Sequence, residues 1–230
     1  MRGPRRIGIS SRRLRIHPHD RVELDGIAVT SAGRTWCDLA QVLTVPELVA
    51  VADRVPEEQL VEALARHPGR RHRRKLLVAL GLRDPASESP PESVLRALVV
   101  LAGLPAPRVN VDIHDRAGDF VARVDQLFDE YGEILEYQGD HHRTDQQQWR
   151  RDRTREAELE SLGFHVTEVT SADLARPREL VERIARNLRR RGWAGAIEYS
   201  PCFPTRSPVP RPGVRNPPRP RTPDAHPPTG

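Results

Sequence analysis

Three strand-like segments follow one another in the middle of the chain with no helix between them, and this run most constrains the fold. Arg108–His114 (RVNVDIH) alternates apolar and polar side chains, as a half-buried strand does. Phe120–Phe128 and Glu133–Gln138 read as two further strands, separated by the turn-like Asp129–Gly132. Strands joined by so short a turn pair antiparallel, so this region predicts the centre of a β-sheet.

Helical patterns surround the strand run. Pro91–Leu101 is amphipathic and begins with proline, and Gln146–Leu162 is a long charged helix closed by Gly163. A strand at Phe164–Val169 and a helix at Pro177–Arg191 follow. The order helix, three strands, helix, strand, helix predicts an α/β domain over residues 90–193, with a mixed β-sheet flanked by helices.

The remaining segments differ from this domain in composition. Residues 1–83 predict a small, mainly helical segment with short strands, and Trp36 is expected to lie in its core. DPASESPP, beginning at Asp84, is a linker by composition, and residues 200–230 predict a disordered tail rich in proline and arginine. The basic run Gly69–Lys75 (GRRHRRK) is either a solvated face or a patch that contacts phosphate.

Charge and cysteine content narrow the class of protein. The formal net charge is +5 and Lys75 is the only lysine, so the positive charge is almost entirely arginine, whose forked donors suit phosphate. This balance argues against a histone-like coat protein and allows a nucleic-acid enzyme. Cys37 and Cys202 form neither a metal-spaced pair nor a disulfide framework, which predicts a reduced, cytoplasmic protein. No signal peptide and no membrane span are expected.

The hairpin Phe120–Gln138 carries the candidate chemistry. With a two-residue loop at Glu130–Tyr131, Asp125 faces Glu136 directly, and the same register places Arg123 opposite Gln138. Opposed side chains have Cβ atoms about 4.5–5.5 Å apart, so two carboxylates there require compensation, and a divalent cation is the usual one. The alternative interpretation is that both acids lie on the solvent face of an edge hairpin.

Two neighbouring features favour the metal interpretation. Glu92 lies on the preceding amphipathic helix, where it can supply another carboxylate. The strand that holds Glu136 runs into Gly139-Asp140-His141-His142-Arg143, a cluster of ligand and proton-carrying side chains. A metal site at His17-Pro18-His19-Asp20 is not expected, because no third group of ligands is in range.

These segments together resemble a known family. PPESVLRALVVLAGL, VARVDQLF, ILEYQGDHHR and WRRDRTREAELESLGFHVTEVT occur in the order seen in the domain-of-unknown-function 559 family. That family is similar to very short patch repair (Vsr-like) endonucleases of the PD-(D/E)XK superfamily, which implies a restriction-endonuclease-like fold. DGIAVTSAGRTWCDLA resembles the linker region of actinobacterial AbiEi-antitoxin-type winged-helix proteins, which makes residues 1–83 the expected remnant of a larger regulatory region.

The resemblance implies roles for individual residues. Asp125, Glu136 and Glu92 match the acidic metal ligands, for Mg²⁺ or Mn²⁺, whereas Gln138 occupies the position of the motif lysine. His142, with His141 as second choice, is the expected general base or leaving-group acid. The arginines expected to hold DNA phosphates are Arg143, Arg150, Arg151 and Arg153, and Asp152 is expected to orient a histidine or an arginine.

The sequence therefore predicts a metal-dependent DNA endonuclease. The alternative is a catalytically degenerate nuclease fold that acts as a DNA-binding or antitoxin-like regulatory module, which glutamine at position 138 favours. A truncated gene product without a cellular role is a third interpretation. The expected partner is DNA, and the tail or the N-terminal segment can contact a protein partner.

Overall fold

A four-stranded mixed sheet is the centre of the computed structural model, which describes residues 16–69, 71–139 and 146–205, with the side chains of 146–153 left undescribed. The strands lie in the order β3-β4-β5-β6, antiparallel except for β6, which runs parallel to β5. Their bounds are β3 Arg108–His114, β4 Phe120–Phe128, β5 Glu133–Gln138 and β6 His165–Thr170. The predicted mixed α/β class is confirmed.

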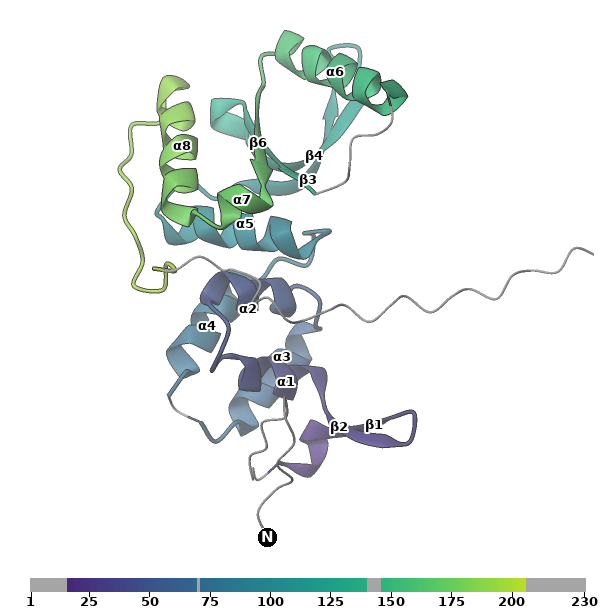
Figure 1. The fold of residues 1–230 in the computed structure, drawn as a ribbon, viewed down its shortest axis with the longest axis vertical. Coiled ribbons are helices and arrows are strands. Elements are labelled where there is room, and N and C mark those ends of the chain that lie inside the picture. The colour runs from purple at the N-terminus through teal and green to yellow at the C-terminus, as the bar shows by residue number, and fades with distance from the viewer. Residues whose placement is uncertain (1–15, 70, 140–145, 206–230) are drawn as a thin grey trace, which may run out of the picture.

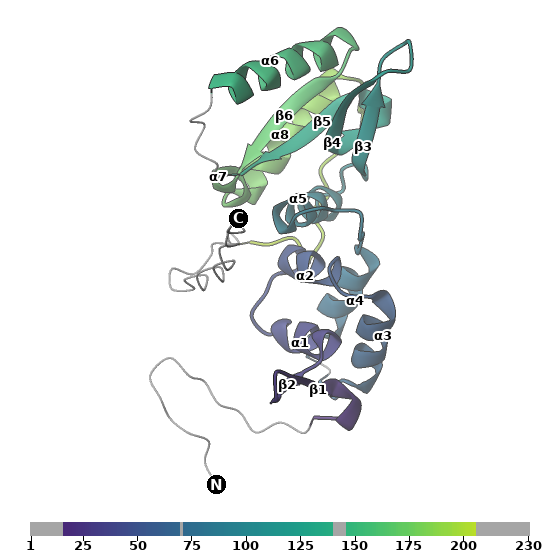
Figure 2. The same ribbon diagram turned by 90° about the vertical axis from the view of Figure 1, so that its right-hand side faces the viewer.

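Helices cover both faces of this sheet (Figures 1 and 2). On one face, Leu159 of α6 packs with Val124 and Ile134 in a small apolar cluster. On the other face, helices α5 and α8 pack against Leu135 and Val169. The helices of this half are α5 Pro90–Leu101, α6 Gln146–Ser161, α7 Ser171–Leu174 and α8 Pro177–Arg190.

The N-terminal half is a small helical body with one hairpin. Its elements are η1 Pro18–Asp20, β1 Arg21–Leu24, β2 Ile27–Thr30, α1 Ala32–Leu39, α2 Val45–Ala52, α3 Glu57–Arg66 and α4 Arg73–Gly81. The hairpin turns at Asp25 and Gly26, which both have positive φ (50° and 76°), as the primed turns of two-residue hairpins require. Thr44 caps α2 through a reciprocal capping box with Glu47, which fixes where that helix begins.

The two halves share one hydrophobic core. Trp36 has no exposed surface, as expected of a core residue, and its indole Nε1 donates to the Leu48 carbonyl at 3.0 Å. The same cluster of buried side chains continues through α2 and α5 to α8, so α5 lies between the helical half and the sheet in both views (Figures 1 and 2). Among the described residues, no helix has the length and apolar character needed to cross a bilayer.

A buried ion pair fastens the segment that the composition marks as a linker. The Arg96 guanidinium of α5 donates to Asp53 Oδ2 at 2.8 Å and to the Leu82 carbonyl at 2.6 Å. The other Asp53 oxygen accepts from the Asp84 backbone N–H at 2.8 Å. Both side chains of the pair are almost fully buried. The segment between α4 and α5 is thus bound by Arg96 at Leu82 and by Asp53 at Asp84.

The predicted start of the disordered tail is wrong. The Glu198 N–H donates to the Ala102 carbonyl, and the Ser200 N–H donates to the Leu101 carbonyl. Phe203 is only 5% exposed and packs with the Tyr199 ring, centroids 4.6 Å apart. The prediction of disorder rested on the proline-rich composition and did not take account of the apolar surface of these two aromatic rings. Both rings pack against the hydrophobic core near the C-terminal end of α5. Residues 206–230 lie outside the described part of the chain.

Candidate functional site

The hairpin β4–β5 has the register expected from the sequence. Gln126 pairs with Leu135 and Phe128 with Glu133, and the recorded pairing ends there, one residue short of Asp125 and Glu136. The expected two-residue loop is wrong, because Asp129–Tyr131 form a turn of 3-10 helix and Gly132 completes a four-residue connection. Gly132 has φ 57°, a left-handed conformation that glycine adopts without strain.

Strand β4 is irregular at Asp125. Val124 and Leu127 contact the same apolar cluster although they are three positions apart, so the alternation of side chains breaks between them. Asn110, between the two pairs that join β3 to β4 on either side of Asp125, has φ 48°. Asp125 therefore lies at a bend, where its Oδ2 accepts the Tyr137 N–H at 2.8 Å.

Glu136 lies beside a cationic side chain, that of Arg155. The Arg155 guanidinium, on α6, donates to the Glu136 carboxylate and forms an ion pair with it. The Glu136 side chain is 13% exposed and that of Arg155 is 37% exposed, so the pair is open to solvent on the arginine side. Glu168 is the register neighbour of Glu136 on β6 and adds a third negative charge nearby.

Burial and the charges of neighbouring acids raise the pKa values of both carboxyl groups. For Asp125, burial is the largest cause, and the charges of Glu92 and Glu88 add to it, while the Tyr137 N–H and Arg155 oppose it. For Glu136, burial again dominates and Asp125 and Glu168 add to it, while Arg155 opposes it. The charge of Asp125 thus acts on Glu136, whereas the acids that act on Asp125 are Glu92 and Glu88, and both charged forms cost free energy.

Glu92 belongs to the same electrostatic neighbourhood, because its charge raises the pKa of Asp125. It is 9% exposed, at the first turn of α5. Its Oε2 accepts the Glu88 N–H at 2.8 Å, and its own backbone carbonyl accepts from the buried Gln126 amide at 3.0 Å. Gln126 thus fastens β4 to the turn of helix that carries Glu92.

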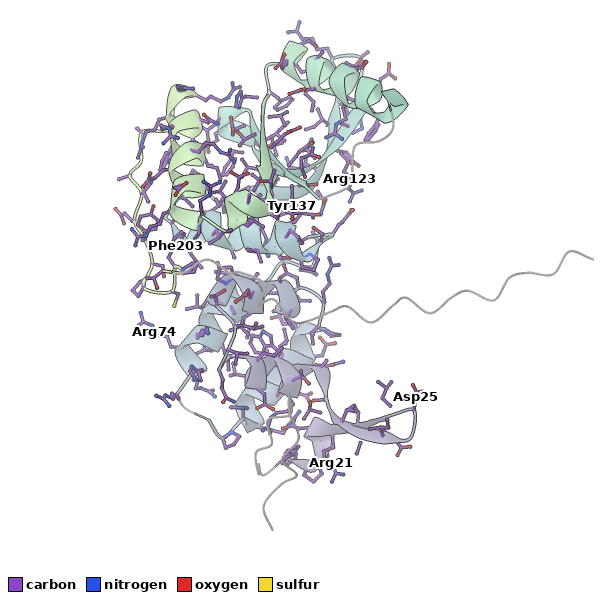
Figure 3. The ribbon with its side chains drawn as sticks, viewed as in Figure 1. Arg21, Asp25, Arg74, Arg123, Tyr137 and Phe203 are labelled. Carbon is purple, nitrogen blue, oxygen red and sulfur yellow. The ribbon has the colours of Figure 1, made fainter. Side chains whose placement is uncertain are left out.

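The structure does not bring every predicted residue into this group. Gln138 Nε2 lies 3.4 Å from Glu168 Oε1. The recorded β4–β5 pairs end at Gln126–Leu135, so they do not reach the expected position of Arg123 opposite Gln138. On its other side Arg123 pairs with Asp112 of β3, and its guanidinium lies 3.1 Å from Glu88. Figure 3 labels Arg123 on β4 and Tyr137 on β5. His141, His142 and Arg143, and the side chains of Arg150, Arg151, Asp152 and Arg153, lie outside the described residues.

Asp125 and Glu136 offer the hard oxygen donors that Mg²⁺ prefers, and both carry an uncompensated electrostatic cost that a cation would remove. Within residues 16–69, 71–139 and 146–205, however, no three acidic, histidine or cysteine side chains are arranged to hold one ion. The Glu92 carboxylate, the expected third ligand, is engaged by the Glu88 N–H.

Sequence reasoning overlooked Arg155. It lies in the quoted segment WRRDRTRE, yet only the earlier arginines of that helix stood out as phosphate ligands. The signal was its place on a charged helix that must pack across the strand holding Glu136. Among the site contacts, Arg155 is the cation nearest to the pair.

The raised pKa of Asp125 predicts that Asp125→Asn increases the stability of the metal-free protein by an amount that depends on pH. As pH rises from the ordinary carboxyl range, about 4, the unfolded aspartate loses its proton before the folded one, so folding is progressively penalised. Asparagine keeps an acceptor for the Tyr137 N–H without this penalty. We expect the variant's advantage in free energy of unfolding to grow between pH 4 and pH 7, measured by urea denaturation with a chelator. If the difference in free energy of unfolding between the variant and the unmodified chain stays constant or shrinks over this pH range, the raised pKa of Asp125 is contradicted.

The fold and site define a mixed α/β protein with two partly buried carboxylates on its two central strands, Asp125 on β4 and Glu136 on β5. Comparison with known proteins adds two relatives from Mycobacterium tuberculosis, uncharacterized protein MT2308 (strain CDC 1551 / Oshkosh) and uncharacterized protein Rv2248 (strain ATCC 25618 / H37Rv). Each is 30% identical to this chain over 179 residues, covering 75% of this chain and 66% of the relative. The match thus spans just under two thirds of each relative's length. No family model and no solved structure matches the chain.

Proposed function

We propose that this chain is a metal-dependent DNA endonuclease with a restriction-endonuclease-like fold, related to the domain-of-unknown-function 559 and Vsr-like group. The order of elements from α5 to α8 supports the fold assignment, since the hairpin, the crossover helix and the parallel strand follow in the expected sequence. The arginine-rich, lysine-poor composition supports a phosphate-containing substrate.

One observation carries the proposal: Asp125 and Glu136 follow directly on the last β4–β5 pair, Gln126–Leu135, and burial and neighbouring acids raise the pKa of both carboxyl groups. Perturbed carboxyl groups of this kind are typical of functional sites. A structural ion pair would lower the pKa of its acid, whereas here Arg155 does not fully compensate Glu136.

Each described residue has a distinct part in this proposal. Asp125 and Glu136 would hold the metal ion, and the Tyr137 N–H orients the Asp125 carboxylate toward the pair. A bound Mg²⁺ or Mn²⁺ would lower the pKa of a water molecule and offset charge on the phosphate. Arg155 can contact a phosphate oxygen when it leaves Glu136, supplying the positive charge that Gln138 lacks.

A cleavage assay on the full chain tests the proposal. Supercoiled plasmid and mismatched duplexes are incubated with Mg²⁺ or Mn²⁺ and, separately, with a chelator. We expect nicking or linearisation that requires the metal. Cleavage that persists with chelator, or no cleavage with any substrate under conditions where the chain is folded, contradicts the endonuclease.

The second candidate is a degenerate nuclease fold that binds DNA without cleaving it. The Arg155–Glu136 ion pair favours it, because a guanidinium already occupies one carboxylate. Metal-independent duplex binding, without cleavage and with an affinity that falls steeply as salt rises, identifies this candidate.

Arg155→Gln separates the two candidates further. Removing the guanidinium takes away a competing positive charge, so we expect Mn²⁺ to bind roughly tenfold more tightly, as a loss of nearby charge repulsion predicts. Isothermal titration measures this, with Arg186→Gln on α8 as a control of equal charge. If Arg155→Gln binds Mn²⁺ more weakly than the unmodified chain does, Arg155 holds Glu136 in place. If neither protein binds Mn²⁺, the second candidate, DNA binding without cleavage, is favoured.

A further inference from the structure

A second candidate site lies in the helical half, at the basic run that the carboxylate site leaves unused. A pocket of about 210 Å³ opens between α1 and the start of α4. Its inner wall is apolar, formed by the buried Cys37 and Leu76. The side chains at its rim are polar or cationic and include Gln41, His67, Arg71 and His72.

The positive charge at this rim is not neutralised by nearby acids. Among the described residues, no acidic side chain forms an ion pair with Arg71, Arg73 or Arg74, which are all exposed. The two oxygens of Asp38, which lies beside the rim residue His67, are engaged by Arg34 at 3.0 Å and His67 at 3.3 Å. The charges of the three exposed arginines are therefore open to an anion from solvent.

Two cations of the basic run Gly69–Lys75 bind backbone carbonyls of the fold, so the other basic side chains of the run are the candidates for binding a ligand. Lys75 Nζ donates to the Ala40 carbonyl at 3.0 Å and so fastens α4 to the end of α1. One guanidinium nitrogen of Arg73 donates to the Leu64 carbonyl at 2.9 Å. Arg74 projects from the surface near this helix start (Figure 3), and neither it nor Arg71 has such a bond among the described contacts.

The charge of Arg73 also reaches the apolar wall. Burial and the charges of Asp38 and Asp20 raise the pKa of the Cys37 thiol to about 12, and Arg34 and Arg73 oppose that rise. The thiol stays protonated and unreactive, so the pocket binds rather than reacts. Helix α4 begins beside the rim residue His72, which makes no side-chain capping bond to its first turn, so the backbone N–H groups of that turn are further donors.

We propose that this pocket binds a phosphate group, with Arg71 and His72 at its rim and Arg74 as a neighbouring contact. Guanidinium forks and backbone N–H groups match the several acceptor oxygens of phosphate, whereas a carboxylate would use fewer of them. The ligand is a phosphodiester of a nucleic acid or a free phosphate. The site lies in the helical half, away from Asp125, and does not depend on endonuclease activity.

The test compares the full chain with Arg71→Gln/Arg74→Gln and with a control of equal charge change, Arg116→Gln/Arg186→Gln, at exposed positions elsewhere. Chelator is present throughout, so cleavage does not interfere. Isothermal titration measures binding of inorganic phosphate, and fluorescence anisotropy measures binding of a labelled duplex over a range of salt concentrations. Circular dichroism confirms that each variant is folded.

We expect the pocket variant to lose phosphate binding and to bind the duplex roughly tenfold more weakly than the control does, with the slope of log affinity against log salt reduced by about two. Loss of phosphate binding with unchanged duplex binding would support a site for free phosphate. If the pocket variant and the control bind both probes equally well, the proposal is overturned.

Discussion

Replacing Asp125 by asparagine is expected to lower the rate of metal-dependent DNA cleavage by about 1000-fold or more. A metal ion stabilises the transition state by several kcal/mol, and each 1.36 kcal/mol is a factor of ten in rate. Asparagine preserves the size of the side chain and its bond to the Tyr137 N–H but removes the anionic oxygen. Single-turnover cleavage of a labelled duplex at saturating protein measures the loss.

The control for this variant is Asp119→Asn, which makes the same chemical change at an exposed position in the turn before β4. We expect it to cleave as the unmodified chain does. Because Asp125→Asn is expected to keep or raise stability at neutral pH, its loss of activity would not reflect unfolding. A variant that retains activity within about tenfold would remove Asp125 from the site.

Breaking the Asp53–Arg96 pair is expected to destabilise the whole chain by about 3–5 kcal/mol, because removing one partner leaves the other buried without its counter-charge. Asp53→Asn keeps the bond from the Asp84 N–H and isolates this effect. For a chain of this size the loss lowers the melting temperature by roughly 10 °C. Differential scanning calorimetry measures it, and one cooperative transition is expected because the halves share a core.

A double-mutant cycle makes the second prediction specific. The double variant Asp53→Leu/Arg96→Met removes both charges. We expect its loss in free energy of unfolding to be smaller than the sum of the losses in Asp53→Leu alone and Arg96→Met alone. Arg176→Ala, which breaks an exposed pair with Glu179, should change stability by about 0.5 kcal/mol or less. Additive single effects would show that the buried charges do not interact.

The strand pattern predicted the sheet well, because the alternation in Arg108–His114 and the turn before Glu133 are local signals. The register of β4 against β5 also followed from the sequence, although the loop did not. The four-residue loop depends on Gly132 adopting a left-handed conformation and on the packing of Phe128 into the core, and neither effect is visible in a hydrophobic pattern.

The surroundings of the acids were harder to predict. Opposition of Asp125 and Glu136 follows from period-two geometry, whereas the Arg155 contact depends on how α6 crosses the sheet, a tertiary arrangement. The bend at Asp125 breaks the alternation that the prediction assumed. The packed stretch around Phe203 was missed because two aromatic residues outweigh their proline-rich neighbours.

Helix α5 carries Glu92 and Arg96 four residues apart, which is about 6 Å along its axis. Arg96 is bonded to α2 of the helical half, and Glu92 stands next to Asp125. One turn of α5 is thus joined to both halves of the chain, through the Arg96–Asp53 ion pair and through the charge of Glu92 on Asp125. A change that displaces this turn is therefore expected to alter both the buried ion pair and the acidity of Asp125.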